Sequence, residues 1–518
     1  MVRLQSYVLG SWHTGQAPFS ALVDPSTEQV VAETSTRGLD FAAVLEHARN
    51  VGGPTLRGMT FAERGALLKA MSKALFADRE RLIEVAMANC GATRGDAKFD
   101  IDGATGTLSY YAYLGKELGD RSVLVDGDSE PLLRNNARFH GLHLKTPRRG
   151  VAVHVNAFNF PAWGTFEKAA VALLAGVPVV SKPATSTAWL AVEMTRVLVD
   201  QGVMPEGSFQ LVAGSAGDLL SHLGGQDVLA FTGSADTGAT LRAGEGPVSR
   251  STRVNVEADS LNAMVLGPDV RVGDDLWNRT VNSVHLEMTQ KTGQKCTAIR
   301  RVFAPEALVE PFIQALSEEL SRLQIGDPRI DGVRMGPLSN AAQLRDYREG
   351  VALLSGEARL AYGSPTEVDA ARSVEGKGCF ASPIVLHCMA PHAASLVHSR
   401  EVFGPVVTVM PYDGSAQDAA ALVNKGGGML VSSLASSDRD FLQAFALEAA
   451  AFNGRLMLVD KKIAEVATPH GMVLPSMVHG GPGRAGGGEE LGGLRGLDLY
   501  MQRTALQGNR GLLDKLFG

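Results

Sequence analysis

Gly150-Val-Ala-Val-His-Val155 is a short apolar run, and it begins the stretch of sequence that decides the fold. A helix-like stretch follows from about residue 163, and a second apolar run, Val177-Pro-Val-Val-Ser-Lys182, comes after it. Two further runs, Phe209-Gln-Leu-Val212 and Val228-Leu-Ala-Phe-Thr-Gly233, continue the same order. Short apolar strands that alternate with amphipathic helices predict a parallel sheet covered by helices on both faces.

The same alternation continues over a second section, from about residue 262 to 470. Its candidate strands are Ala263-Met-Val-Leu266, Arg300-Arg-Val-Phe303 and Val406-Val-Thr-Val409. Residues from about 38 to 116, which precede both sections, have apolar positions three and four residues apart and therefore predict packing helices. The sequence indicates an α/β protein with two sheet-containing units that pack closely.

A different pattern lies between the predicted helices and the first sheet. Polar and apolar residues alternate in Arg121-Ser-Val-Leu-Val-Asp126 and in Ala137-Arg-Phe-His-Gly-Leu-His-Leu-Lys145. Alternation of this kind predicts strands with one face in water. We expect a projecting ribbon that pairs with a neighbouring chain.

Length and charge narrow the class of protein. With 518 residues the chain exceeds what one hydrophobic core usually supports. A net charge of -6 offers no basic stripe for a phosphate backbone, so we expect a small-molecule substrate and no nucleic acid. The best apolar run, Ala169 to Val180, is broken by Gly176 and Pro178, and the first residues lack an apolar signal core. We therefore expect a cytoplasmic protein without a membrane segment.

A candidate phosphate site follows the last strand of the first section. Phe231-Thr-Gly-Ser-Ala-Asp-Thr-Gly238 places two glycines and two hydroxyl residues at the start of a helix, where free amides and the helix dipole favour an anion. Lys182 and Thr185 follow a neighbouring strand and should face the same ligand. Each feature also has a simpler explanation. The glycines can belong to an ordinary strand-to-helix turn, and Lys182 can be a solvent-exposed lysine.

Gly293-Gln-Lys-Cys296 follows a probable helix from about residue 275 to 290. The flanking residues Gln294 and Lys295 are polar, which favours exposure of this segment. A nucleophilic cysteine needs a base and an oxyanion acceptor close by, and Glu257 and Asn159 are the candidates. The alternative for any single cysteine is a small buried hydrophobic residue.

In their order along the chain these segments resemble the aldehyde dehydrogenase family, and the resemblance covers nearly the whole sequence. The matching segments are the asparagine segment at Asn159-Phe-Pro161, the ribose-binding Lys182, the cofactor turn Phe231-Thr232-Gly233-Ser234, the general base Glu257, the nucleophile segment at Cys296, the nicotinamide-ribose segment Glu401-Val402-Phe403-Gly404-Pro405 and the C-terminal carboxylate segment Glu490-Leu-Gly492.

The resemblance implies a mechanism. The Cys296 thiolate would attack the aldehyde carbon, and the oxyanion would be met by the Asn159 amide and the Cys296 backbone N–H. Hydride transfer to the nicotinamide would leave a thioester, which water activated by Glu257 would hydrolyse. Glu401 would hydrogen-bond the nicotinamide ribose, and Glu490 would belong to the catalytic group.

The resemblance also implies a three-part fold that assembles as a homodimer or homotetramer. Residues 1–129 and 151–258 would form a Rossmann-like cofactor-binding domain, and 259–480 an α/β catalytic domain. Residues 130–150 and 481–518 would form a small β oligomerisation ribbon and the C-terminal segment.

Departures from the common family pattern bear on the substrate. The chain has Ala157-Phe158 in place of Pro-Trp, and Ala258-Asp-Ser-Leu261 in place of Leu-Gly-Gly-Lys. Its run from His479 to Glu490, with Tyr500-Met-Gln-Arg-Thr-Ala505, resembles family members of aerobic benzoate degradation that oxidise a CoA-linked semialdehyde. This branch of the family implies such a substrate here.

The cofactor is expected to be NADP, with NAD as the second choice. Many NAD-preferring members carry a glutamate where this chain has Thr185, and that glutamate would repel a 2'-phosphate. A neutral hydroxyl removes the repulsion, and Lys182 supplies a positive charge.

Two other functions stay open at the level of sequence. One is a CoA-acylating aldehyde dehydrogenase, against which Glu257 counts because water attack most needs a base. The other is an inactive family member with a binding or structural role. No metal is expected, since His140 and His143 lack a third ligand. His479 is expected either to line the substrate mouth or to pack against the glycines beside it.

Overall fold

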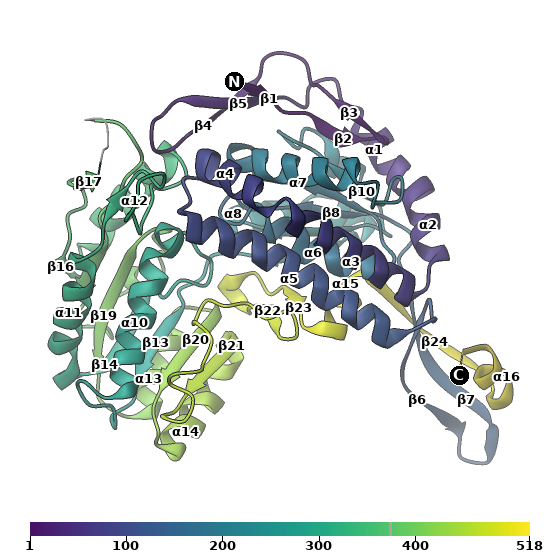
Figure 1. The fold of residues 1–518 in the computed structure, drawn as a ribbon. Coiled ribbons are helices and arrows are strands. Elements are labelled where there is room, and N and C mark those ends of the chain that lie inside the picture. Colours follow the sequence, from purple (N-terminus) through teal and green to yellow (C-terminus); the bar gives the residue numbers. More distant parts are fainter. Residues whose placement is uncertain (372–375, 518) are drawn as a thin grey trace.

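A computed structural model describes residues 1–371 and 376–517 (Figure 1). Two large parts, each built on a seven-stranded sheet, make up most of the molecule, and a ribbon projects from one of them. Residues 372–375, which belong to the range 259–480, and Gly518 lie outside the described residues. Within the described ranges, no helix is both long and apolar enough to cross a lipid bilayer.

The first sheet has the strand order β12-β11-β8-β9-β10-β2-β3. Its five strands from β12 to β10 run parallel, whereas β2 and β3 pair antiparallel at one edge. The strands are β2 (Ser6–Val8), β3 (Ser11–His13), β8 (Ala152–Val155), β9 (Val179–Lys182), β10 (Phe209–Leu211), β11 (Val228–Thr232) and β12 (Arg253–Glu257). The four strands predicted between residues 150 and 233 are confirmed, and β2 and β3 come from a segment in which the sequence predicted none.

Helices cover the first sheet and confirm the helical prediction for residues 38 to 116. They are α1 (Phe41–His47), the π turn η1 (Ala48–Gly52), α2 (Gly53–Gly58), α3 (Phe61–Ala77), α4 (Arg79–Cys90), α5 (Arg94–Leu118), α6 (Trp163–Ala175), α7 (Ala188–Asp200), α8 (Ala235–Arg242) and α9 (Glu245–Arg250). α5 and α6 approach closely at Gly103, where an added Cβ would lie 2.2 Å from the Trp163 ring. This contact fixes the start of α6, which carries charged residues of the site.

The second sheet has the order β16-β18-β19-β14-β13-β20-β21, and all its strands except β16 are parallel. The strands are β13 (Ala263–Leu266), β14 (Arg301–Pro305), β16 (Arg359–Tyr362), β18 (Ile384–His387), β19 (Val406–Tyr412), β20 (Met429–Ala435) and β21 (Asn453–Val459). The helices of this part are α10 (Asp275–Thr289), α11 (Glu306–Ser321), α12 (Ala341–Leu354), α13 (Ala416–Asn424) and α14 (Arg439–Ala449). Separate apolar clusters form on the two faces of the sheet, as expected for a parallel sheet buried on both sides.

The ribbon is a three-stranded antiparallel sheet of β6 (Leu124–Leu133), β7 (Asn136–Pro147) and β24 (Met501–Asn509). It extends away from the rest of the molecule, and the C-terminal helix α16 (Arg510–Phe517) packs on it (Figure 1). The strand β6 begins ahead of the range 130–150 that the sequence suggested. The remaining elements are short: β1 (Val2–Arg3), β4 (Ser20–Val23), β5 (Val30–Thr34), β15 (Ile325–Gly326), β17 (Ala370–Ala371), β22 (Val478–Gly480), β23 (Glu489–Leu491) and α15 (Leu497–Tyr500).

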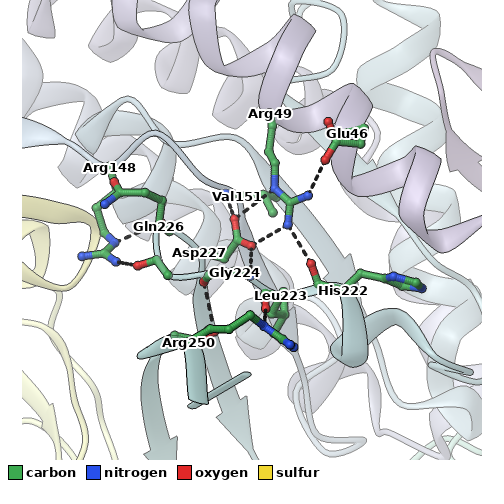
Figure 2. A network of polar contacts seen from close by, with 12 residues as sticks. Glu46, Arg49, Arg148, Val151, His222, Leu223, Gly224, Gln226, Asp227 and Arg250 are labelled. Atoms are coloured by element: carbon green, nitrogen blue, oxygen red, sulfur yellow. Dashed lines mark hydrogen bonds and ion pairs between the residues drawn. The ribbon is translucent and has the colours of Figure 1, made fainter. Parts of the chain in front are cut away.

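A buried carboxylate fixes one end of the first sheet (Figure 2). The Asp227 side chain accepts hydrogen bonds from Val151 N at 2.8 Å and Gly224 N at 2.6 Å, and it pairs with Arg49. Arg148 donates to the backbone oxygen of Gln226 at 3.0 Å. These contacts lie just before β8 and β11 begin, so they align the strands from the edge opposite to their carboxyl ends.

Candidate active site

Functional side chains gather where the carboxyl edge of the first sheet meets the second sheet. Glu257 ends β12, Lys182 ends β9 and Thr232 ends β11, while Asn159 follows β8. Because these strands are parallel, their carboxyl ends lie at one edge, where ligands of open α/β sheets bind. Cys296 lies a few residues before β14, a strand of the second sheet. The amino end of β14 therefore places the thiol beside the carboxyl edge of the first sheet.

Cys296 is held by a tight backbone turn. The preceding short helix η4 (Gln290–Gly293) contains Lys291, Thr292 and Gly293 with φ values of 52°, 56° and 67°, all in the left-handed region. An added Cβ on Gly293 would lie 2.4 Å from the carbonyl oxygen of Gly404, so only glycine fits there. The turn leaves Cys296 partly exposed.

The residues beside the thiol are buried, contrary to the exposure that their polarity suggested. The Lys295 side chain is 1% exposed and pairs with the fully buried Glu287 at 2.8 Å. Gln294 accepts a hydrogen bond from Ser339 N at 3.1 Å. These polar side chains therefore anchor the nucleophile turn from beneath, because internal partners replace water.

Glu257 lies between Cys296 and His479. Its Oε2 is 3.3 Å from His479 Nε2, and a carboxylate oxygen of Glu257 lies within 4.8 Å of Cys296 Sγ. Burial raises the pKa of Cys296, and the Glu257 charge raises it further. Burial also tends to raise the pKa of Glu257, but His479 and Lys168 offset this and lower it to about 2. Glu257 is therefore ionised beside a protonated thiol.

Asn159 stands on the other side of the thiol. Its Nδ2 donates to the Gln294 carbonyl oxygen at 3.0 Å, and Thr187 fixes the same loop by donating to the Phe158 carbonyl oxygen at 3.0 Å. The side-chain amide is thus directed at the backbone of the nucleophile turn, beside Cys296. A preorganised amide in this position is suited to binding an oxyanion.

A buried acidic and basic group continues beyond Glu257. Lys168 on α6 contacts Glu167 at 2.9 Å and Glu490 at 3.1 Å, and its own side chain is 1% exposed. Burial raises the pKa of Glu490 to about 7. The β22–β23 pairing sets His479 opposite Glu490, so one hairpin delivers both residues to Glu257. The sequence analysis missed Glu167 and Lys168, although two adjacent charges inside the apolar helix α6 were a signal.

Two cavities meet at Cys296. The first is lined by apolar side chains that include Phe99, Phe160 and Trp163, together with Lys168 and His479. The second is lined by residues of the β11–α8 turn, of the segment after β12 and of the segment before β19, namely Thr232, Gly233, Ser234, Asp259, Glu401 and Phe403. Cys296, Asn159 and Glu257 line both cavities. Two ligands can therefore approach the thiol from different sides.

The β11–α8 turn fits a phosphate-bearing ligand. The Ser234 hydroxyl caps α8 by accepting from Thr237 N at 3.3 Å, and the buried Thr232 Oγ1 has no hydrogen-bond partner among the described residues. An added Cβ on Gly233 would lie 2.4 Å from the Phe231 ring, which keeps the backbone open to the cavity. Phe231 itself is buried beneath the turn and packs against Val256.

Of the remaining residues proposed for the cofactor, Glu401 and Phe403 line the same cavity, whereas Lys182 and Thr185 do not line it themselves. Ala184, between Lys182 and Thr185, lines it, and burial lowers the pKa of Lys182. Glu401 accepts from Ser260 N at 3.0 Å and from Arg300 Nε at 3.1 Å. The Arg300 partnership was not foreseen from the sequence.

No residues converge on a metal at the histidine pair of the ribbon, since His140 is buried and His143 is exposed on the opposite face of β7. Among the described residues, two trios of side chains have potential ligand atoms within 4.8 Å of one another, Glu257–Cys296–His479 and Glu167–Glu257–Glu490. Both trios consist of the acid, base and thiol groups of the site itself.

A thiol with an adjacent carboxylate and amide, placed between two cavities of an α/β fold, is suited to covalent catalysis on a carbonyl carbon. The chain belongs to the aldehyde dehydrogenase family, whose sequence model matches residues 12–505. It is 44% identical over 481 residues to 3,4-dehydroadipyl-CoA semialdehyde dehydrogenase of Aromatoleum evansii, which is 93% of this chain and 93% of that protein.

Solved structures show the same fold. One is 3,6-anhydro-L-galactose dehydrogenase, with a TM-score of 0.84 and 21% identity over 98% of this chain and 100% of that one. Another is lactaldehyde dehydrogenase of Escherichia coli, with a TM-score of 0.84 and 22% identity over 98% of this chain and 99% of that one. The expected aldehyde dehydrogenase fold is confirmed.

Proposed function

We propose that this enzyme oxidises a CoA-linked semialdehyde, 3,4-dehydroadipyl-CoA semialdehyde, to the corresponding acid with NADP, through a thioester on Cys296. The observation that carries the proposal is the position of Cys296 at the junction of two cavities, beside Glu257 and Asn159. The substrate assignment is supported by the 44% identity to the Aromatoleum enzyme over 93% of both chains. In this proposal the reaction belongs to benzoate degradation.

In the first half-reaction the Cys296 thiol passes its proton to the Glu257 carboxylate, which has an oxygen within 4.8 Å of Sγ. The thiolate then attacks the aldehyde carbon, and a thiohemiacetal forms on Cys296. The oxyanion accepts hydrogen bonds from Asn159 Nδ2 and the Cys296 backbone N–H. Removal of one such donor typically costs about 3 kcal/mol of barrier.

The cofactor would lie in the second cavity. Bound NADP supplies the hydride acceptor of the reaction. Thr232, Gly233 and Ser234 would hold its pyrophosphate at the start of α8, and Glu401 its nicotinamide ribose. Lys182 and Thr185 offer a cation and a neutral hydroxyl for the adenosine ribose, a pairing that accommodates a 2'-phosphate.

In the second half-reaction water must attack the thioester. Glu257 first passes the thiol proton to Glu490 and is then free to act as the base again. Glu490 lies within 4.8 Å of it and has a pKa of about 7, so it accepts and releases protons near neutrality. This buried base is the argument against a CoA-acylating enzyme, and the intact set of groups is the argument against an inactive family member.

The proposal extends to the parts of the fold. The first sheet, from 1–129 and 151–258, would bind the cofactor, and 259–480 would supply the nucleophile. The ribbon and the C-terminal segment would pair between subunits of a homo-oligomer, because their edge strands are unpaired within the described chain.

The test is formation of reduced nicotinamide at 340 nm. The CoA-linked semialdehyde is compared with the free semialdehyde acid, and NADP with NAD, for wild type and Cys296→Ala. We expect turnover that prefers NADP and the CoA-linked aldehyde, and that vanishes in Cys296→Ala while nucleotide binding persists. Equal use of the free aldehyde would refute the substrate assignment, and preference for NAD would refute the cofactor assignment.

A further inference from the structure

The segment that follows Glu257 carries a carboxylate into the second cavity. Asp259 Oδ1 accepts a hydrogen bond from Ala235 N at 3.0 Å, and Ala235 is the first residue of α8. Asp259 Oδ2 lies 3.5 Å from Arg484 Nη2, and the Asp259 side chain is 29% exposed. The first free amide of α8 is therefore taken by an anion that belongs to the protein.

Asp259 lies among the groups that would receive the cofactor. It lines the second cavity together with Gly233, Ser234 and Glu401. Burial raises the pKa of Glu401, and the Asp259 charge raises it further, which reflects how close the two carboxylates lie. A dinucleotide that brings its own phosphates to this turn would meet a negative side chain at the same helix terminus.

We propose that the Asp259 carboxylate acts as an internal anion that occupies the phosphate position at the start of α8, and that NADP binds by displacing it toward Arg484. The inference rests on the proposed function, which puts the pyrophosphate at this turn. It deepens that function by assigning Asp259 as a residue that sets cofactor affinity.

Physical reasons support displacement over coexistence. A helix terminus carries roughly half a positive charge and offers few free amides, so one anion satisfies it and a second is repelled. Arg484 already lies beside Asp259 Oδ2. It belongs to the glycine-rich run that begins at His479. A side-chain rotation that exchanges Ala235 N for Arg484 keeps Asp259 paired and frees the amide for phosphate.

The test compares two substitutions that remove the same charge. Asp259→Asn keeps the shape of the side chain but loses its charge, and Asp236→Asn does the same at an exposed position in the first turn of the same helix. The dissociation constant for NADP is measured by isothermal titration calorimetry without aldehyde. Inorganic pyrophosphate serves as a second probe, scored by its competition with NADP.

We expect Asp259→Asn to bind NADP about tenfold more tightly than wild type, because one like-charge contact at close range is removed. Asp236→Asn should stay within about twofold of wild type, since an exposed charge is screened by solvent and salt. Pyrophosphate should compete better in Asp259→Asn than in wild type.

Unchanged or weaker NADP binding in Asp259→Asn would overturn the inference, as would an equal gain in both variants. If Asp259→Asn does not fold, Asp259→Ser carries the same expectation. Wild type that binds no NADP would instead overturn the proposed cofactor site, so the two failures are distinguishable.

Discussion

Charged neighbours of Glu257 set its ionisation state. His479 is 3.3 Å from its carboxylate, Lys168 contributes a second positive charge, and Cys296 offers the proton. Burial lowers the pKa of His479, but the Glu257 charge overcomes this and raises it. The pair is therefore an ion pair inside the protein, and each member keeps the other charged.

His479→Phe should move the acid limb of the pH–rate profile. Loss of the imidazolium removes the main group that lowers the pKa of Glu257, so the carboxylate is protonated at a higher pH and activity is lost earlier as pH falls. With a Glu257 pKa of about 2, wild type should show no acid limb from this group above pH 4, whereas in His479→Phe we expect a shift of more than about two pH units that brings the limb into this range. The measurement is kcat/KM from pH 4 to 9, together with the rate of Cys296 alkylation by iodoacetamide.

The matched control for this experiment is His143→Phe, an exposed histidine on the ribbon. It should leave the profile unchanged. An unaltered acid limb in His479→Phe would show that Lys168 alone holds Glu257 ionised.

The sequence pointed to Cys296, Glu257 and Asn159, and the structure brings all three together. The sequence could not reveal the ion pairs of His479 and Lys168. These ion pairs depend on how the β22–β23 hairpin packs against β12 and α6. Lys295 shows the same limit: its polarity predicted exposure, and only the buried Glu287 explains why it lies inside.

At the scale of elements, contacts at one edge of the first sheet align the strand ends at its carboxyl edge. Asp227 joins the segments before β8 and β11 to the π turn through Arg49 (Figure 2). Its side chain is 2% exposed, so water cannot replace a lost partner. The position of Asn159 and Thr232 at the far ends of these strands depends on this alignment.

Asp227→Asn should destabilise the protein, because it removes the charge that pairs with Arg49 and leaves buried donors poorly satisfied. We expect a loss of about 2–4 kcal/mol, seen as a lower midpoint of thermal unfolding. Asp218→Asn is the control, since it removes an exposed carboxylate from a neighbouring segment and should change the midpoint little. Equal effects of the two substitutions would contradict the role given to Asp227.

Elements were predictable where apolar residues run together. The parallel strands β8, β9 and β11 lie in apolar runs because both their faces are buried, and the three-residue strand β10 was predicted in the same way. The edge strands β2 and β3 were not predicted, because Ser6-Tyr-Val8 and Ser11-Trp-His13 mix polar and apolar residues. β2 joins the sheet by pairing with β10, about two hundred residues away, and β3 pairs with β2.

At the scale of the whole molecule, the ribbon exposes apolar side chains that the described chain does not cover. Leu133 at its tip is 52% exposed and Leu132 is 37% exposed, while α16 buries the opposite cluster around Leu142 and Leu144. The unpaired edges of β6 and β24 lie alongside. Together they form a surface suited to contact with a second copy.

The double substitution Leu132→Ser with Leu133→Ser should weaken self-association without unfolding the chain, because both residues are exposed. Each buried leucine contributes roughly 1.5–3 kcal/mol to an interface, and a symmetric interface counts each substitution twice. Light scattering after size exclusion should show a smaller mass. The control, Leu353→Ser with Leu447→Ser, alters exposed leucines elsewhere and should keep the wild-type mass. An unchanged mass in the ribbon variant would contradict the proposal.

The position of the β22–β23 hairpin in the sequence determines when the site is completed in the nascent chain. The first sheet has all its strands once residue 257 has been made, and Cys296 emerges soon after. His479 and Glu490 follow only after nearly two hundred further residues. During synthesis Cys296 and Glu257 are therefore present before His479 and Glu490, and the site is complete only when the β22–β23 hairpin docks.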